Sequence, residues 1–275
     1  MIKRREVRTV YPKERQRVLL ELLAQHGFAS YRQLAERLGV SEITVRRDMK
    51  ALEAQGLVET AFGGGQVARA ARELPYTDKR ILQIPEKIAI AKAALRQIES
   101  GMTIAIAAGT TTWVLAQHIA GFQNLTFLTN SVNVATELSK NGYRDIFLTG
   151  GQFRTPSDAL VGPVAEHMIR QFRADILFVG ASGLHVDHGL STPNVLEAAV
   201  NRAMMERAAR VVVLADHTKW GVESLMSFAK LNEIDALITD RWPGEAEAAA
   251  LAECDVELIV ADAPNAESSK RGDAQ

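Results

Sequence analysis

Cysteine is almost absent from this sequence, since Cys254 is the only one among 275 residues. A single cysteine excludes an intramolecular disulfide and a cysteine-rich metal cluster, and it fits a reducing compartment. No stretch of about 18 consecutive apolar residues occurs, so no transmembrane helix is expected. The basic start, Met1 to Arg5, continues into further charged residues and not into the apolar stretch of a signal peptide. Together these absences predict a cytoplasmic protein.

The net charge is also small, at −1, but it is unevenly distributed. Residues 1–72 carry 14 Lys and Arg against 8 Asp and Glu, whereas residues 73–275 carry 18 against 25. Hydrophobic residues make up 47% of the chain, which is enough for a sizeable core, and the length favours two domains. A basic N-terminal part attached to an acidic body indicates that only the N-terminal part approaches a polyanion.

The basic part has the pattern of three helices followed by a glycine-rich hairpin. Apolar residues repeat at helical spacing in three segments, residues 14–23, 31–38 and 41–55. Gly39 is placed to end the second helix, and Ser41 is placed to cap the third. Strand-like runs flank Gly63–Gly65; a phosphate loop would need a helix after these glycines, so we interpret them as a hairpin tip. The pattern predicts a winged helix-turn-helix over residues 13–68.

The third helix separates into an apolar face and a basic face. At 100° per residue, Val45, Met49 and Leu52 face inward, and the opposite face is mainly cationic. Arginine suits bidentate contact with guanine, a threonine or apolar side chain suits a thymine methyl group, and a helix N-terminus suits a phosphate. The alternative is a solvated basic face on a structural helix. We predict DNA contacts from six residues: Ser41, Ile43, Thr44, Arg46, Arg47 and Lys50.

From Glu86 onward, short apolar runs alternate with helical patterns. The strand-like runs are residues 103–108, 125–129, 145–149, 176–180, 211–215, 236–239 and 256–260. The helical patterns are residues 86–99, 112–120, 131–140, 162–172, 195–209 and 245–253. This alternation is typical of an α/β fold with a doubly wound parallel sheet. We predict a linker at 69–85, the larger α/β domain at 86–262 and a disordered tail at 263–275.

Loops that follow the predicted strands have a composition suited to an anionic ligand. Gly109–Thr112 opens a helix, where unpaired N–H groups and threonine hydroxyls favour an anion, although a simple capped turn is the alternative. Four such loops at the carboxyl ends of strands favour a shared pocket. Lys219 and Glu197 are further candidates for ligand contacts. The alternatives are that Lys219 is a solvated surface lysine and that Glu197 is an acid favoured in the first turn of a helix by the helix dipole. The predicted ligand-binding residues are Gly109, Thr110, Thr111, Thr112, Asn130, Ser131, Gly150, Gly151, Ser182, Glu197 and Lys219.

Metal and cofactor sites are not expected from the sequence. The six histidines include no recognisable metal-ligand spacing, and the pair His185 and His188 lies in a glycine-rich loop.

Several motifs resemble the DeoR family of bacterial transcriptional regulators. The run Ser-Glu-Ile-Thr-Val-Arg-Arg-Asp at residues 41–48 is the most specific of them. Segments similar to the family's effector domain extend from residue 86 to residue 221. The resemblance implies a domain with the fold of ribose-5-phosphate isomerase and related enzymes. It also implies a homo-oligomer that represses a carbohydrate-catabolism operon until a phosphorylated sugar or related metabolite binds.

Four positions depart from the family pattern. Thr60 and Phe62 stand in the wing where the family often has arginine and histidine, so wing contacts to DNA are not predicted. Ala107 and Ser182 stand where aspartates are common, so two carboxylates that would bind hydroxyls or transfer protons are missing. The effector is therefore expected to be less hydroxylated or more anionic than is usual in the family.

Two classes of function compete for this sequence. The first is a ligand-responsive repressor whose partners are double-stranded operator DNA and a small phosphorylated metabolite. The second is an enzyme, a sugar-phosphate isomerase or deaminase, with a DNA-binding domain attached. General acid–base catalysis needs positioned acids, and Ala107 and Ser182 remove two of them. A purely architectural DNA binder leaves the long α/β part unexplained, so we expect a regulator that is not an enzyme.

Overall fold

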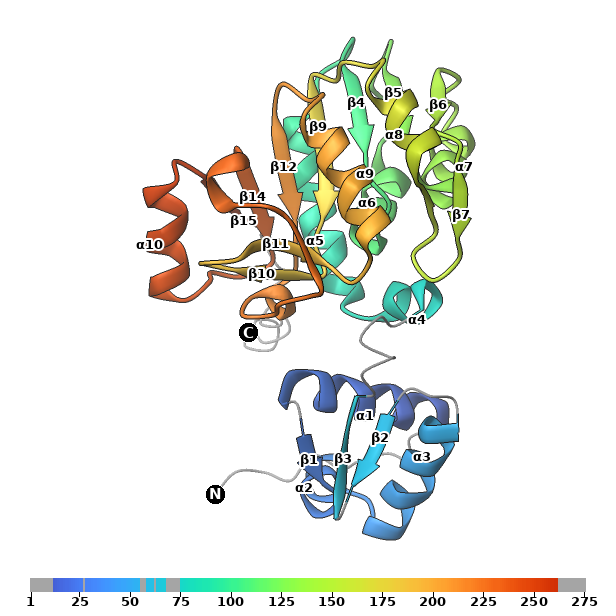
Figure 1. Cartoon of the computed structure of the whole chain (residues 1–275), viewed down its shortest axis with the longest axis vertical. Helices are drawn as coiled ribbons and strands as arrows, with labels where there is room; N and C mark the ends of the chain where they lie inside the picture. The colour runs from blue at the N-terminus through green and yellow to red at the C-terminus, as the bar shows by residue number, and fades with distance from the viewer. Residues whose placement is uncertain (1–11, 27, 55–57, 62, 68–74, 262–275) are drawn as a thin grey trace, which may run out of the picture. The chain divides into compact units, whose positions relative to one another are not determined.

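The computed structural model describes residues 12–26, 28–54, 58–61, 63–67 and 75–261. The chain forms two compact units, Met1–Leu74 and Pro75–Gln275 (Figure 1). Phe62, residues 69–74 of the predicted linker and the predicted tail at 263–275 lie outside the described residues. Within the described ranges, every helix is too short or too polar to cross a membrane.

The first unit combines three helices with a small antiparallel sheet. Its elements are α1 (Pro12–His26), β1 (Phe28–Ser30), α2 (Tyr31–Leu38), α3 (Glu42–Ala54), β2 (Val58–Ala61) and β3 (Gly64–Val67). The strand order is β1-β3-β2, and Gly63, with a φ of +79°, lies between the two strands of the predicted hairpin. Gly64 must remain a glycine because a Cβ there would lie 2.3 Å from the carbonyl oxygen of Ala29. These elements are those of a winged helix-turn-helix.

The core of this unit joins all three helices. Leu19 and Leu23 of α1, Leu34 of α2, and Val45 and Met49 of α3 are almost fully buried. The buried face of α3 is the one predicted from its apolar spacing. Burying this face leaves the opposite face of α3 toward solvent.

One buried ion pair fastens α1 to α3. The Arg15 guanidinium donates from Nη2 to Oδ1 of Asp48 at 3.1 Å and from Nε to the other carboxylate oxygen. The side chain of Asp48 is only 4% exposed and that of Arg15 is 14% exposed. A bidentate pair of this kind satisfies the carboxylate that α3 would otherwise bury without a partner.

The second unit is built on a seven-stranded sheet in which every neighbouring pair is parallel. Its strands are β4 (Thr103–Ile106), β5 (Thr126–Thr129), β6 (Ile146–Leu148), β9 (Ile176–Gly180), β12 (Val211–Leu214), β14 (Ala236–Thr239) and β15 (Glu257–Val260). The order is β15-β14-β12-β9-β4-β5-β6. The chain therefore winds outward in one direction from β4 and then in the other from β9, which is the doubly wound arrangement predicted from the alternating pattern.

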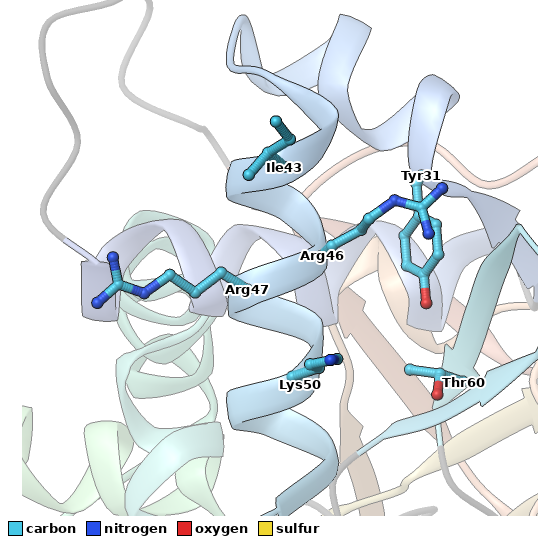
Figure 2. Close-up of a pocket in the computed structure, with 6 residues that line it drawn as sticks. All are labelled: Tyr31, Ile43, Arg46, Arg47, Lys50 and Thr60. Carbon is cyan, nitrogen blue, oxygen red and sulfur yellow. The ribbon is translucent and has the colours of Figure 1, made fainter.

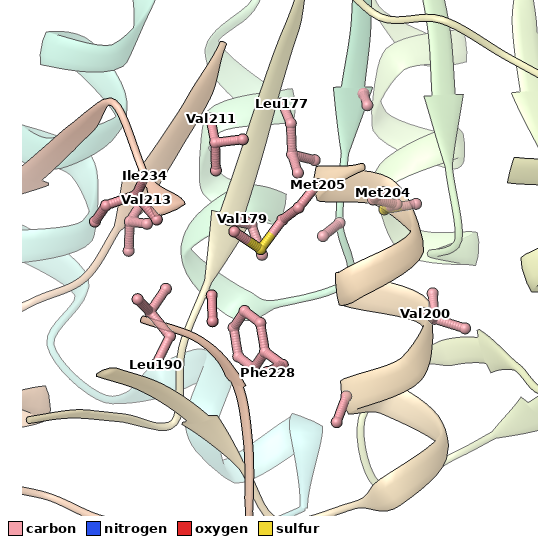
Figure 3. Packing of buried hydrophobic residues seen from close by; sticks show 14 of the residues in the cluster. Leu177, Val179, Leu190, Val200, Met204, Met205, Val211, Val213, Phe228 and Ile234 are labelled. Atoms are coloured by element: carbon pink, nitrogen blue, oxygen red, sulfur yellow. The ribbon is translucent and has the colours of Figure 1, made fainter. Parts of the chain in front are cut away.

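Helices cover both faces of this sheet. One face packs against α5 (Ile84–Ala94), α6 (Thr110–His118) and α7 (Val132–Lys140). The other packs against α8 (Pro163–Ile169), α9 (Val195–Met205) and α10 (Glu245–Glu253). Alternate residues of one strand enter the two cores, as with Leu177 and Phe178 of β9. Figure 3 shows Met205 of α9 reaching toward Leu177 and Val179 of β9.

Several short elements were not predicted from the sequence. The strands are β7 (Gln152–Arg154) and β8 (Ala159–Val161), which form a hairpin, and β10 (Gly183–His185), β11 (Gly189–Thr192) and β13 (Met226–Ala229), which form a small sheet. The 3-10 turns are at Leu95–Gln97, His217–Lys219 and Leu231–Glu233.

The helix α4 (Tyr76–Ile81) corrects the prediction that the whole range 69–85 is a linker. This helix is too short to show a period in the sequence. It is attached to the second unit by its side chains, because Tyr76 is buried and Arg80 lies 3.9 Å from the ring centroid of Trp113 on α6.

Candidate functional site

The turn before α3 is held by its own hydroxyl groups. Ser41 Oγ accepts a hydrogen bond from the backbone N–H of Thr44 at 3.2 Å and lies 2.9 Å from Thr44 Oγ1. Gly39 ends α2 with a φ of +65°, in the left-handed region that glycine favours. Of the predicted DNA-binding residues, Ser41 and Thr44 therefore form the cap that starts α3.

The solvent face of α3 carries the other four predicted residues. Ile43, Arg46, Arg47 and Lys50 line an open groove of about 390 Å³ together with Tyr31 of α2 and Thr60 of β2 (Figure 2). Three of these six side chains are cations. The groove matches the electrostatic requirement of a nucleic-acid backbone.

Arg46 differs from Arg47 in having partners within the unit. Its guanidinium lies 4.4 Å from the ring centroid of Tyr31, and its Nη2 lies 3.8 Å from a carboxylate oxygen of Glu42. The side chain of Arg47 forms no ion pair or hydrogen bond with any described residue, and Figure 2 shows it pointing away from Arg46. The helical spacing places Arg47 opposite the apolar face and Arg46 on its flank, and in the structure the two side chains are also held differently.

Thr60 ties the wing to α3. The carboxylate of Glu53 accepts hydrogen bonds from the backbone N–H of Thr60 at 3.1 Å and from its hydroxyl group. These two hydrogen bonds lower the pKa of Glu53, and the charge of Lys50 adds to them. Thr60, which stands where the family often has arginine, thus helps to fix the orientation of the wing relative to α3.

At the carboxyl edge of the large sheet, the start of α6 presents backbone donors. Thr110, Thr111 and Thr112 form the first turn of α6, and the first backbone N–H groups of a helix have no partner within it. Thr112 is fully buried, and its hydroxyl donates to the carbonyl oxygen of Ala107 at 2.7 Å. Gly109 is tightly packed, since a Cβ there would lie 3.1 Å from Thr112 Oγ1. The hydroxyl of Thr112 thus holds the turn from which α6 begins.

Asn130 and Ser131 connect the neighbouring loops. The amide of Asn130 accepts from the backbone N–H of Ala108 at 2.8 Å and donates to the carbonyl oxygen of Leu160 at 3.2 Å. Ser131 caps α7, and its hydroxyl donates to Asp158 at 2.5 Å. Both side chains are almost completely buried. They brace the end of β5 against the loop after β4 and against β8.

The glycines after β6 allow a close approach to β8. Gly150 and Gly151 have φ values of +68° and +105°, and a Cβ at Gly151 would lie 2.6 Å from the carbonyl oxygen of Val161. Both positions favour glycine for their positive φ, and Gly151 also requires it for space.

Glu197 has two partners inside the protein. One carboxylate oxygen lies 2.8 Å from Nη1 of Arg154 on β7, and the other accepts from the hydroxyl of Thr192 at 3.0 Å. Arg154 was not predicted as a site residue, because nothing in the neighbouring sequence distinguishes it from a surface arginine. The Arg154–Glu197 pair connects the β7–β8 hairpin to the start of α9, and both side chains are at most 20% exposed.

Ala107 and Ser182, the two positions at which the family commonly has aspartate, differ in burial. Ala107 is fully buried in the core beside β4. Ser182 is half-buried, and its backbone N–H donates to the carbonyl oxygen of Ser191 at 2.9 Å.

A buried charge cluster lies where β12 ends. Asp216 is 1% exposed, and its Oδ1 accepts from the backbone N–H of Thr218 at 3.0 Å. Burial alone raises the pKa of Asp216, but the charge of Lys219 and the hydrogen bonds from Thr218 outweigh it, and the pKa is lowered. Lys219, on the 3-10 turn that follows β12, is half-buried.

Lys87 also belongs to this cluster, and it was not among the residues predicted from the sequence. It is only 3% exposed, and its Nζ donates to the carbonyl oxygens of Lys79 and Leu82 at 2.5 and 2.7 Å. Burial lowers the pKa of Lys87 to about 8, although the nearby charge of Asp216 raises it. Its helical position alone looks like that of a surface lysine, so only the tertiary structure identifies it.

The buried ammonium group of Lys87 should make stability depend on pH. Between pH 8 and 10.5 the unfolded chain binds the proton that folded Lys87 has lost, so the free energy of unfolding should rise with pH. We expect urea midpoints of the wild type to rise over this range relative to a Lys87→Met variant. Lys92→Met, which removes an exposed lysine of the same helix, should follow the wild type. Parallel profiles for wild type and Lys87→Met would contradict the buried-lysine assignment.

The described residues include no group of three or more His, Cys, Asp or Glu side chains arranged to hold a metal ion. One histidine is nevertheless firmly held, since Nδ1 of His217 lies 2.8 Å from Oδ2 of Asp240. The backbone N–H of His217 donates to the other oxygen of Asp240 at 2.7 Å.

Comparison with known proteins gives two family matches. The DeoR-like helix-turn-helix domain matches residues 15–70, and the DeoR C terminal sensor domain matches residues 82–241. The solved structure of ribose 5-phosphate isomerase A from Methanocaldococcus jannaschii covers 49% of this chain and 53% of its own. Its TM-score of 0.37 and 15% identity are too low to carry an argument.

Curated relatives span most of the chain. The HTH-type transcriptional regulator GlpR of Haloferax volcanii is 39% identical and covers 83% of this chain and 90% of its own length. The transcriptional repressor AccR of Agrobacterium fabrum is 34% identical, covering 82% and 89%. The glycerol-3-phosphate regulon repressor of Escherichia coli is 32% identical, covering 84% and 91%. All three are named as transcriptional regulators or repressors, which agrees with the first of the two predicted classes of function. The chain belongs to the DeoR family of DNA-binding transcriptional regulators.

Proposed function

We propose that this protein represses a carbohydrate-catabolism operon and that an anionic metabolite, such as a phosphorylated sugar, releases it from operator DNA. The observation that carries the proposal is the start of α6, where first-turn N–H groups lie at the carboxyl edge of the sheet. The name of one relative, the glycerol-3-phosphate regulon repressor, supports a phosphorylated compound as the class of effector. The proposal includes a homo-oligomer, because two linked DNA-binding units gain affinity that one lacks.

The proposed anion site combines the dipole of α6, the threonine hydroxyl groups at its start and the side chain of Lys219. The N–H groups of Thr110–Thr112 and the positive end of α6 favour a phosphate group. Lys219 follows β12, which is separated from β4 only by β9, so the two strand ends are about 10 Å apart. A lysine side chain reaches most of that distance. Lys87, whose pKa is affected by the charges of Asp216 and Lys219, adds a second positive charge when it is protonated.

The remaining predicted ligand residues support the pocket in this proposal. Asn130, Ser131 and Glu197 use their polar atoms for hydrogen bonds within the protein, so they hold the loops in place. Gly151 allows the start of the β7–β8 hairpin to lie close to β8. We therefore expect the strongest loss of ligand binding from changes at Lys219 and Thr111.

The missing carboxylates narrow the effector class. Ala107 is fully buried and Ser182 has no charge, so neither accepts hydrogen bonds from sugar hydroxyls as an aspartate does. A ligand with few hydroxyls and a strong negative charge fits these residues better than a long polyol phosphate.

The test is a thermal-shift titration of the full chain with inorganic phosphate, glycerol 3-phosphate and glucose 6-phosphate. We expect at least one of them to raise the melting temperature and to weaken binding to the operator. Lys219→Ala and Thr111→Ala should each reduce ligand affinity about tenfold, the size of one lost charge-assisted hydrogen bond, and should leave ligand-free DNA binding unchanged.

Lys92→Ala, an exposed lysine of α5, is the matched control and should respond like the wild type. If the wild type responds and both pocket variants respond equally, the effector binds elsewhere. Steady conversion of the bound compound in an NMR time course would contradict the purely regulatory role.

A further inference from the structure

Ile43 is an exposed apolar side chain in a place where exposure is costly. It is 79% exposed, more than any other large hydrophobic residue in the described ranges, yet it is the second residue of α3. Because α3 packs through its opposite, apolar face, the fold of the unit would accept a polar residue at this position. A β-branched apolar residue there stabilises neither the helix nor the core of the unit.

The neighbours of Ile43 define what can cover it. At 100° per residue, Arg47 and Lys50 lie within about 40° of Ile43 around α3, and all three line the same groove (Figure 2). The cations make a second copy of this surface a poor occupant, because like charges would face each other. Double-stranded DNA satisfies the cations with its phosphates and displays apolar groups, the methyl groups of thymine, in a major groove that admits an α-helix.

The six predicted DNA-binding residues divide by their partners. The hydroxyls of Ser41 and Thr44 are used in the helix cap, and Arg46 is stacked on Tyr31. Arg47 and Ile43 have their outer ends free of such contacts among the described residues. These two are also near the N-terminal end of α3, the part of a recognition helix that contacts base edges.

We propose that Ile43 reads the 5-methyl group of a thymine in each operator half-site. Ile43 and Arg47 are one helical turn apart, or about 6 Å along α3, while base pairs are spaced about 3.4 Å apart. The thymine therefore lies within about two base-pair steps of the base that Arg47 contacts. The inference concerns the DNA-binding activity of the family and is independent of the effector.

The experiment removes the methyl group and nothing else. Operator duplexes are first selected from a random pool with the full chain. Each thymine of a selected half-site is then replaced singly by deoxyuridine, and affinity is measured by fluorescence anisotropy at one salt concentration. For the wild type, we expect one position per half-site at which the replacement weakens binding about threefold to fivefold, the effect of losing one buried methyl group.

Ile43→Ala should bind the thymine and deoxyuridine duplexes equally at that position. Leu225→Ala removes another strongly exposed apolar side chain, from the second unit, and should keep the wild-type pattern. Because Ile43 is largely exposed, Ile43→Ala should melt like the wild type, so a changed pattern reports recognition and not unfolding. The inference is overturned if the wild type tolerates deoxyuridine at every position or if Ile43→Ala keeps the discrimination.

Discussion

Replacing Asp48 with alanine should destabilise the DNA-binding unit by about 3 kcal/mol and abolish operator binding. The substitution leaves the Arg15 guanidinium in its site on α1 without the carboxylate that it contacts through two nitrogens. Removing one partner of a buried pair typically costs about 3–5 kcal/mol. The lower end applies here because Arg15 is 14% exposed and water can reach part of it. A loss of this size is a large fraction of the stability of a small domain.

The controls for Asp48→Ala separate charge from packing. Glu36→Ala removes an acid whose side chain is 66% exposed on α2, so its cost should stay within about 0.5 kcal/mol. The double variant Arg15→Met/Asp48→Leu removes both charges and should be more stable than Asp48→Ala, since the charge of Arg15 is removed together with the carboxylate that it pairs with. Urea denaturation followed by circular dichroism measures all three. A double variant no more stable than Asp48→Ala would show that the ion pair is not the reason for the loss.

Replacing Arg47 with alanine should weaken binding to the selected operator by about 1–3 kcal/mol, the size of one bidentate contact to guanine. Arg47 is exposed and without an ion pair among the described residues, so folding should not change. Binding to random DNA should change much less, because base contacts matter only for the correct sequence. Anisotropy titrations of both duplexes at several salt concentrations provide the measurement.

Two further variants serve as comparisons for Arg47→Ala, one for a phosphate contact and one for an arginine outside the DNA-binding unit. Lys50→Ala is expected to weaken specific and random binding alike and to reduce the salt slope by about 1, as for a phosphate contact. Arg144→Ala removes an exposed arginine of the second unit and should bind both duplexes as the wild type does. If Arg47→Ala behaves like Lys50→Ala, then Arg47 contacts only the backbone of DNA.

The sequence predicts those parts of the fold that local patterns control. The seven strands of the parallel sheet are short, mainly apolar runs, and the buried face of α3 follows from Val45, Met49 and Leu52. Short elements that depend on distant pairing were missed. Strand β11, for example, pairs with β13 through Leu190 and Ala229, and no local pattern in either segment indicates this.

The candidate sites show the same division. Loop composition correctly located glycines and threonines at the ends of strands, but it could not tell which polar atoms are already used within the protein. Asn130 looks like a ligand contact in the sequence, yet its amide joins Ala108 to Leu160. Lys87 looks like a surface residue, yet it is buried beside Asp216. Such roles depend on which segments meet in space.

The central claim is that the solvent face of α3 lies against operator DNA. It is tested most directly by placing a photo-crosslinking amino acid, p-benzoylphenylalanine, singly at Arg47 of α3 and at Val164 of α8, both of which are exposed. Irradiation of the full chain with labelled operator should produce a crosslink from position 47 that unlabelled operator competes away, and none from position 164. A crosslink of equal yield from position 164, or none from position 47 while operator remains bound, would contradict the account.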